Sequence, residues 1–253
     1  MTRWISGRKW TYGLFGLLLL AVAWQVAAQA TDKVVFPTLT SSLAALRDVG
    51  KGTVLTGDVL PSIYRVLAGF LISGVLGAAL GVLTGYFRLL DDWVSGVVSF
   101  VRALPFPLLL PLAIVVTGIG NVTIVTLIVV GSVWPVYINA YDGTRAIDPL
   151  TYDVVKICGL SRLQMFRRVI VPSVLPAIFS GLRVALGFCL AVMVVAEMLT
   201  APNGIGHFLV ASEQTFAVPQ TFAGVIAVGI IGFILDSALL FVERFTLRHM
   251  PAS

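Results

Sequence analysis

The stretch from Asp142 to Pro176 reads DGTRAIDPLTYDVVKICGLSRLQMFRRVIVPSVLP and forms a polar, basic island between long apolar segments. It carries five basic residues, although only 11% of the 253 residues in the chain are charged. The chain as a whole is 58% hydrophobic, with a mean hydropathy of +0.99. This composition excludes an ordinary soluble domain.

The apolar segments on both sides of the island are long enough to cross a membrane, which takes roughly 20 mainly apolar residues. Within a bilayer the backbone must bond internally, and these runs lack the period-2 alternation of barrel strands, so they are helices. The sequence therefore predicts an all-α polytopic membrane protein, a single domain over residues 1–253. The six expected transmembrane helices lie near 12–30, 59–87, 93–118, 122–141, 177–199 and 222–242.

The basic residues predict the orientation of these helices. Six spans put both termini and the island on one side, and 11 of the 17 basic residues fall there. The opposite loops hold only Lys33, Arg47 and Lys51. Because cytoplasmic loops carry an excess of Lys and Arg, we expect both termini and the island to be cytoplasmic. Cleavage after Ala28-Gln29-Ala30, as in a signal peptide, would leave an odd number of spans and is disfavoured.

Local signals within the island predict two short helices. Asp148-Pro149 is a good helix start, with a capping carboxylate followed by proline at the first helical position. Gly159 tolerates the left-handed backbone of a helix end. Ser161 and Gln164 then form an S-x-x-Q capping box for a second helix, which we expect to end at Pro172.

This pair of helices is expected to expose apolar side chains among charges, namely Val154, Val155, Ile157, Cys158 and Leu160. One interpretation is a docking surface for another protein. The alternative is a plain connecting loop whose amphipathic helix lies on the membrane surface.

The spacing of Asp153, Gly159 and Val169–Pro172 resembles the E-A-A-x3-G-x9-I-x-L-P loop of the membrane subunits of binding-protein-dependent ABC importers. Here Asp153-Val154-Val155 replaces Glu-Ala-Ala, and valines replace the Ile and Leu. In that family the loop, here 142–176, forms the coupling helix that docks onto a separate ATPase. The residues that the resemblance assigns to coupling are Asp153, Val154, Val155, Lys156, Cys158, Gly159, Leu160 and Ser161.

The resemblance to nitrate/sulfonate/taurine-type permeases covers residues 10–245. It is carried as well by Phe36-Pro37, Ser62–Phe70, Arg102–Pro105, Ala196–Met198 and Leu235-Asp236. It implies a bacterial cytoplasmic (inner) membrane subunit that binds no cofactor, with ATP and Mg held by the partner. The implied partners are two ATPase subunits, a second copy or a paralogue, surrounding lipid, and a periplasmic or lipid-anchored binding protein that meets Asp32–Thr56 and Thr200–Thr221. The implied cargo is sulfonate or taurine, nitrate, bicarbonate or an aromatic carboxylate, with a pyrimidine-type precursor as the alternative.

The chain carries no chemistry of its own that the sequence reveals. It lacks the G-x4-G-K-[ST] phosphate loop, so we do not expect an ATPase, and its charge shows no nucleic-acid pattern. No metal site is expected, because His207, in a glycine-rich external turn, and His249 are isolated from each other and from the two cysteines. A gradient-driven secondary transporter would favour paired broken helices, of which we identify only one.

Small residues recur at every fourth position of the second span, namely Gly69, Ser73, Gly77, Gly81 and Gly85. Steps of four stay on one helix face and allow a close helix approach. The stripe predicts packing inside the subunit or, alternatively, across a dimer.

Prolines interrupt the third span and indicate irregular backbone, which is tolerated at membrane depth only inside protein or beside a cavity. The expected pathway residues are Arg102, Pro105, Phe106, Pro107, Tyr137, Asn139 and Glu197. Arg102 is expected to favour anions or, alternatively, to pair with Asp236. An unpaired charge at mid-bilayer costs roughly 2.5–3.5 kcal/mol. Arg65 and Arg183 are therefore expected to reach toward the interfaces.

Overall fold

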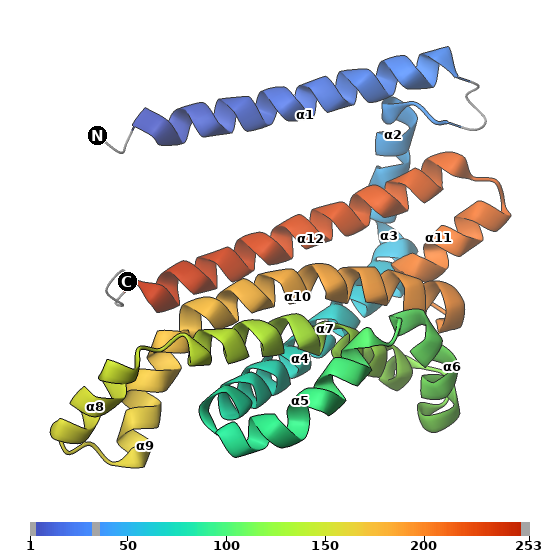
Figure 1. Ribbon diagram of the computed structural model, residues 1–253. Coiled ribbons are helices and arrows are strands. Elements are labelled where there is room, and N and C mark those ends of the chain that lie inside the picture. The colour runs from blue at the N-terminus through green and yellow to red at the C-terminus, as the bar shows by residue number, and fades with distance from the viewer. Residues whose placement is uncertain (1–3, 32–35, 249–253) are drawn as a thin grey trace.

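The computed structural model describes residues 4–31 and 36–248, and every regular element in that part is helical (Figure 1). The long helices are α1 (Trp4–Ala30), α4 (Leu60–Tyr86), α7 (Asn121–Arg145), α10 (Val171–Thr200) and α12 (Val218–Leu247). Short elements connect them, namely α2 (Leu39–Val49), α3 (Gly52–Val54), the π-helix η1 (Leu55–Val59), α5 (Arg88–Ala103), α6 (Phe106–Thr117), α8 (Pro149–Ile157), α9 (Arg162–Met165), the π-helix η2 (Phe166–Ile170) and α11 (Ile205–Gln214).

Four helical stretches in the described residues are long and apolar enough to cross a membrane: Gly52–Tyr86, Asn121–Arg145, Arg162–Thr200 and Val218–Leu247. A fifth is added if α5 and α6, which are bent by 107° relative to each other, form one broken span. The predicted break in the third span is thus confirmed, whereas the count of six and the side of the membrane each end faces stay predictions.

The two ends of the bundle carry different elements (Figure 1). The elbow, which we define as α8, Gly159 and α9, projects at one end, where α1 also begins and α12 ends. Helices α2, α3 and α11 lie at the other end, called here the network end.

The small-residue stripe of α4 packs on α7 of the same chain. Added Cβ atoms at Gly69, Gly77, Gly81 and Gly85 would all collide with α7, the one at Gly77 lying 2.7 Å from the carbonyl oxygen of Val133. Ser73, the remaining member, is buried. Helices can approach this closely only where side chains are small. The stripe therefore serves packing inside the subunit, the first of its two predicted roles.

Pro172 does not end the helix that precedes it, contrary to expectation. The helical run is continuous for 39 residues, from Arg162 to Thr200, through η2. In η2 the bonds skip one residue more than in an α-helix, with the N–H of Val171 donating to the carbonyl of Phe166. Pro172 follows directly after this wider turn, and the helical run passes the proline without a break.

Candidate functional site

The elbow forms by the local bonds that its sequence predicts. The N–H of Leu150 donates to the Asp148 carboxylate at 2.8 Å, and this bond caps α8. Gly159 has a φ of +69°, the left-handed conformation that reverses the chain. Ser161 and Gln164 make both bonds of the capping box, at 3.3 and 2.9 Å. These predictions are confirmed.

The outer surface of the elbow is apolar. Leu150, Val154 and Ile157 stand at positions i, i+4 and i+7 of α8 and are all exposed, Ile157 to 85%. Leu163 on α9 is exposed too. Val155 was expected to be exposed but is only 6% exposed, because it lies on the opposite side of α8 from Ile157. The spacing of Leu150, Val154 and Ile157 at i, i+4 and i+7 could have identified this exposed face from the sequence.

The remaining predicted coupling residues lie around this apolar face. Asp153, Cys158, Gly159 and Ser161 are exposed, and Leu160 is half-buried. The Lys156 side chain lies outside the described residues. Behind the face, Tyr152 packs against Tyr86 at the end of α4, with ring centroids 6.4 Å apart. The elbow is thus seated on the bundle by one side and open on the other.

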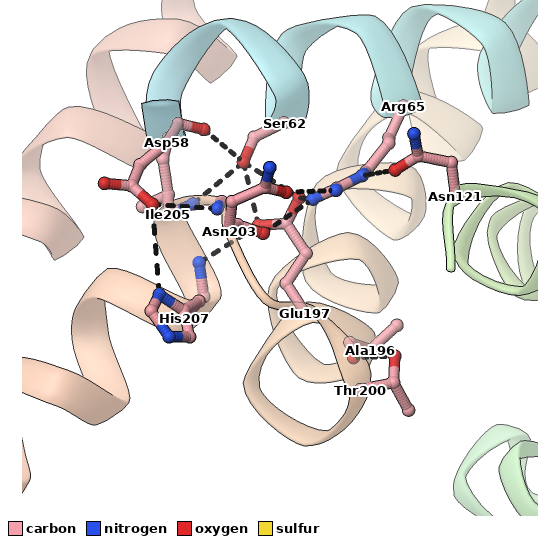
Figure 2. A network of polar contacts seen from close by, with 12 residues as sticks. Asp58, Ser62, Arg65, Asn121, Ala196, Glu197, Thr200, Asn203, Ile205 and His207 are labelled. Carbon is pink, nitrogen blue, oxygen red and sulfur yellow. Dashed lines mark hydrogen bonds and ion pairs between the residues drawn. The ribbon is translucent and has the colours of Figure 1, made fainter. Parts of the chain in front are cut away.

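A buried ion pair joins α4 to α10 near the network end (Figure 2). Arg65 and Glu197 are 2% and 0% exposed, and their side chains meet at 2.6 Å. Glu197 also accepts a bond from Ser62, at 2.8 Å, and Arg65 donates to Asn121 at 2.8 Å. The sequence led us to expect that Arg65 reaches toward the membrane interface. Arg65 is instead buried, because Glu197 provides an internal counter-ion.

The same network fixes the start of α11. Asn203 accepts bonds from Arg65 through its carbonyl and its side-chain oxygen, at 2.9 and 2.6 Å. The N–H groups of Gly204 and Gly206 donate to Asp58 and Glu197 at 2.9 and 3.0 Å. Gly204 has a φ of +120°, and a Cβ there would lie 2.5 Å from the Glu197 carboxylate, so only glycine fits. The backbone of the loop is thus held by the buried carboxylate of Glu197 and the half-buried carboxylate of Asp58.

His207 lies in the first turn of α11 at the edge of this network (Figure 2). Its Nδ1 is 3.9 Å from Asp58, and its side chain is partly exposed. The expectation of a solvated loop residue is therefore correct for exposure but wrong for the element. Asp58, Ser62 and Arg65 share one face of the chain entering α4, a polar i, i+4, i+7 pattern that could have indicated the network.

A cavity of about 650 Å³ lies between α5, α6, α7 and α10. Arg102 and Asn139, two of the predicted pathway residues, line it. A second cavity of about 330 Å³ shares Arg102 and is also lined by Tyr137. The structure thus brings three of the predicted pathway residues together at these two cavities.

Other predicted pathway residues lie elsewhere. Glu197 is part of the buried network and lines neither cavity. Pro105 is exposed at the junction of α5 and α6, and the side chains of Phe106 and Pro107 lie outside the described residues. Arg102, at the end of α5, lies just before the interruption of the span and lines both cavities.

The alternative pairing of Arg102 with Asp236 is wrong. Asp236 lies 4.0 Å from Arg183, which also forms an ion pair with Glu243. The expected outward reach of Arg183 is therefore replaced by a pairing between α10 and α12. No ion pair to Arg102 is present within residues 4–31 and 36–248.

Comparison with known proteins gives consistent matches. The putative aliphatic sulfonates transport permease protein SsuC of Bacillus subtilis is 31% identical over 247 residues, which cover 96% of this chain and 90% of that protein. The nitrate import permease protein NrtB of Synechocystis is 30% identical over 74% of this chain and 68% of its own length. The bicarbonate transport system permease protein CmpB of Synechococcus elongatus is 29% identical, covering 76% and 70%.

A solved structure shares the fold. It is an inward-facing conformation of the MetNI methionine ABC transporter, with a TM-score of 0.62 and 19% identity over 73% of this chain and 94% of that one. Residues 74–248 match the family described as the binding-protein-dependent transport system inner membrane component. This match includes the second half of α4, the cavity helices, the elbow and α12, and the chain belongs to that family.

Proposed function

We propose that this chain is the membrane-spanning permease subunit of an ATP-driven importer, and that it moves a small anion delivered by an external binding protein. The observation that carries the proposal is the exposed apolar face of the elbow at one end of a bundle of membrane helices. The relatives named for sulfonates, nitrate and bicarbonate support an anionic cargo.

The elbow is the docking site for a separate ATPase subunit, which supplies ATP and Mg. Leu150, Val154 and Ile157 form a contiguous apolar face on α8, and Leu163 lies on the neighbouring α9. An exposed cluster of this kind marks a protein interface when it lies outside the hydrocarbon core. Two copies of the permease present two elbows, one for each of two ATPase subunits. The permease itself catalyses no reaction.

Movement of the elbow reaches the cavity through two helices. On one side, α9 continues without interruption through η2 into α10, which contributes Val184 and Phe188 to the cavity wall. On the other side, α7 ends just before α8 and contributes Trp134 and Asn139. An ATPase pair that closes on ATP would therefore shift both walls together, which is the geometry that alternating access requires.

The elbow faces the cytoplasm of a bacterial cell in this proposal, in agreement with the excess of basic residues around it. The network end then faces outward and presents α2 and α11 to the binding protein. These helices fall within Asp32–Thr56 and Thr200–Thr221, the segments expected to form that surface.

An Ile157→Asp variant tests the docking role. Because Ile157 is 85% exposed, the folded permease tolerates the change. In the docked complex, however, the new carboxylate would be buried against an apolar surface of the ATPase subunit, which is costly. We expect at least a tenfold loss of ATPase association, measured by native mass spectrometry of the complex in mild detergent, and loss of ATP-driven uptake. Phe216→Asp, on an equally exposed aromatic residue at the network end, is the matched control and should leave the ATPase bound.

Normal ATP-driven uptake by the Ile157→Asp variant would contradict the proposal. A chain that purifies alone after mild crosslinking, with uptake driven by an ion gradient, would identify a secondary transporter instead.

A further inference from the structure

We propose that the 650 Å³ cavity beside Arg102 is a selectivity site for organic monoanions that carry an apolar body. The head group binds the Arg102 guanidinium, and the body lies against Trp134 and Phe188. This inference rests on the proposed transport function and sharpens it, because it favours an alkyl or aryl sulfonate or carboxylate over nitrate or bicarbonate.

The charge of the cavity comes from one side chain. Of the described residues that line it, Arg102 is the only ionisable one. Asn139 is the other strongly polar residue, and its amide nitrogen already donates to the carbonyl of Pro135 at 2.8 Å. A ligand therefore meets one positive charge and almost no further hydrogen-bond donors, which suits a single anionic group.

Arg102 has no protein counter-ion within the described residues, in contrast to Arg65 and Arg183, the other two arginines inside the predicted spans. Arg65 is paired with Glu197, and Arg183 with Glu243. A cation at membrane depth is unfavourable unless a partner or water compensates it. Arg102 is exposed, so water compensates its charge when no ligand is bound, and an anionic ligand takes the place of that water as the partner of the guanidinium.

The remaining walls are apolar and suit a larger body than an inorganic anion has. Val130, Phe188 and Val192 are among the residues that surround the space. The volume of about 650 Å³ falls in the range of small-molecule sites, roughly 300–1,000 Å³. A strongly hydrated ion would lose water here without replacement donors, whereas an apolar chain gains by leaving water.

The second cavity offers a route of release toward the elbow. It shares Arg102 and Ile138 with the first but also exposes Tyr141, Asp91 and Asp142. Its position near the end of α7 places it closer to the elbow, because α7 runs toward Arg145. Asp91 is already paired with Arg145, but Asp142 forms no ion pair within the described residues, and its carboxylate disfavours the return of an anion that leaves Arg102 on this side. Arg102 thus lies between the first cavity, where the anion binds, and the second cavity, through which it leaves.

Trp134 provides a direct readout of binding. The complete permease–ATPase complex in lipid nanodiscs is titrated with sodium hexanesulfonate while tryptophan emission is recorded. A complex with the Trp134→Phe variant defines the signal from all other tryptophans of the complex, including the other four of this chain. Hexanol supplies the same body without charge, and sodium nitrate supplies charge without a body. We expect saturable quenching by hexanesulfonate and at least about tenfold weaker responses to the two comparison probes.

Arg102→Gln should weaken hexanesulfonate binding at least about tenfold and leave the hexanol response unchanged, while Arg102→Lys retains most of the affinity. Because Arg102 is exposed, the thermal unfolding curve of the complex with Arg102→Gln should match that of the parent complex. Equal binding of nitrate, unaltered affinity in Arg102→Gln, or no Trp134 response to any probe would overturn the inference. The ATPase remains associated in all these variants if the proposed function holds, so failure of the selectivity site is distinguishable from failure of the importer assignment.

Discussion

The network end and the elbow end of the bundle satisfy their side chains in opposite ways. At the network end, the charges of Arg65 and Glu197 are buried and bonded, and no buried polar side-chain atom in the described part of the chain lacks a partner. At the elbow end, Ile157 and its apolar neighbours are exposed, and the ion pair between Arg183 and Glu243 is partly open. The charges at the network end are thus compensated within the chain, whereas the apolar face of the elbow is left uncovered by the described residues.

This difference assigns the two ends different mechanical roles. The Arg65–Glu197 pair and its bonds to Asn203 and Gly206 tie α4, α10 and the start of α11 into one unit. Buried bonds of this kind are costly to break, because each leaves an unsatisfied charge. We infer that the network end stays fixed during transport. The elbow then moves the parts of α7 and α10 that lie next to it, relative to that fixed end.

Removing one member of the buried pair is the strongest way to break this contrast. Glu197→Ala leaves Arg65 buried without its counter-ion, and we expect the free energy of unfolding to fall by about 3–5 kcal/mol. The loss is measured by denaturant unfolding of the detergent-solubilised complex, followed by circular dichroism.

Glu243→Ala is the matched control at the elbow end. It removes one partner of Arg183, whose side chain is partly exposed and keeps Asp236 at 4.0 Å, so we expect a loss of no more than about 1 kcal/mol. Equal losses in the two variants would show that burial of the Arg65–Glu197 pair does not distinguish the two ends.

The elbow could be predicted from the sequence and the network could not, for a physical reason. Asp148, Gly159 and Ser161 act through bonds that span two to five residues, so their patterns are visible in a short window. Arg65 and Glu197 are 132 positions apart. Hydropathy indicates how deep such a charge lies in a helix but not which neighbouring helix its side chain faces, and both residues were therefore assigned other roles.

The remaining differences have the same origin. Val155 was assigned to the exposed surface by its neighbours in the motif, but the helical period turns it toward the bundle. Pro172 was expected to end a helix by its own chemistry, yet it follows directly after a π turn and the helical run passes it without a break. Local rules give the elements, whereas the rotation of one element against another depends on packing that a single sequence does not show.

The contact between α4 and α7 bears on the comparison of the network end with the elbow end, because these two helices run from one end of the bundle toward the other (Figure 1). Gly77→Ala places a methyl group 2.7 Å from the carbonyl oxygen of Val133, and the backbone there cannot give way cheaply. We expect a loss of about 1–3 kcal/mol in the free energy of unfolding, measured by the same denaturant titration.

Gly96→Ala in α5 is the control for helix propensity, since a Cβ there meets nothing within 4 Å. It should stabilise by about 0.5–1 kcal/mol. A Gly77→Ala variant that behaves like Gly96→Ala would mean that α4 and α7 separate readily, and the fixed region at the network end would then not extend along α4.

The smallest expected effect concerns Phe216, two residues after the end of α11 at the network end. It is 87% exposed and has a φ of +54°, the left-handed conformation at a position where glycine is usual. Phe216→Gly relieves about 1–2 kcal/mol of backbone strain but gives the unfolded chain more freedom, so we expect a net gain of about 0.5–1 kcal/mol. Phe216→Ala removes the same ring but keeps the Cβ, and it should bring no gain. If both variants are equally stabilised in the denaturant titration, the exposed ring of Phe216, and not its backbone conformation, destabilises the parent. The turn after α11 would then hold no backbone strain.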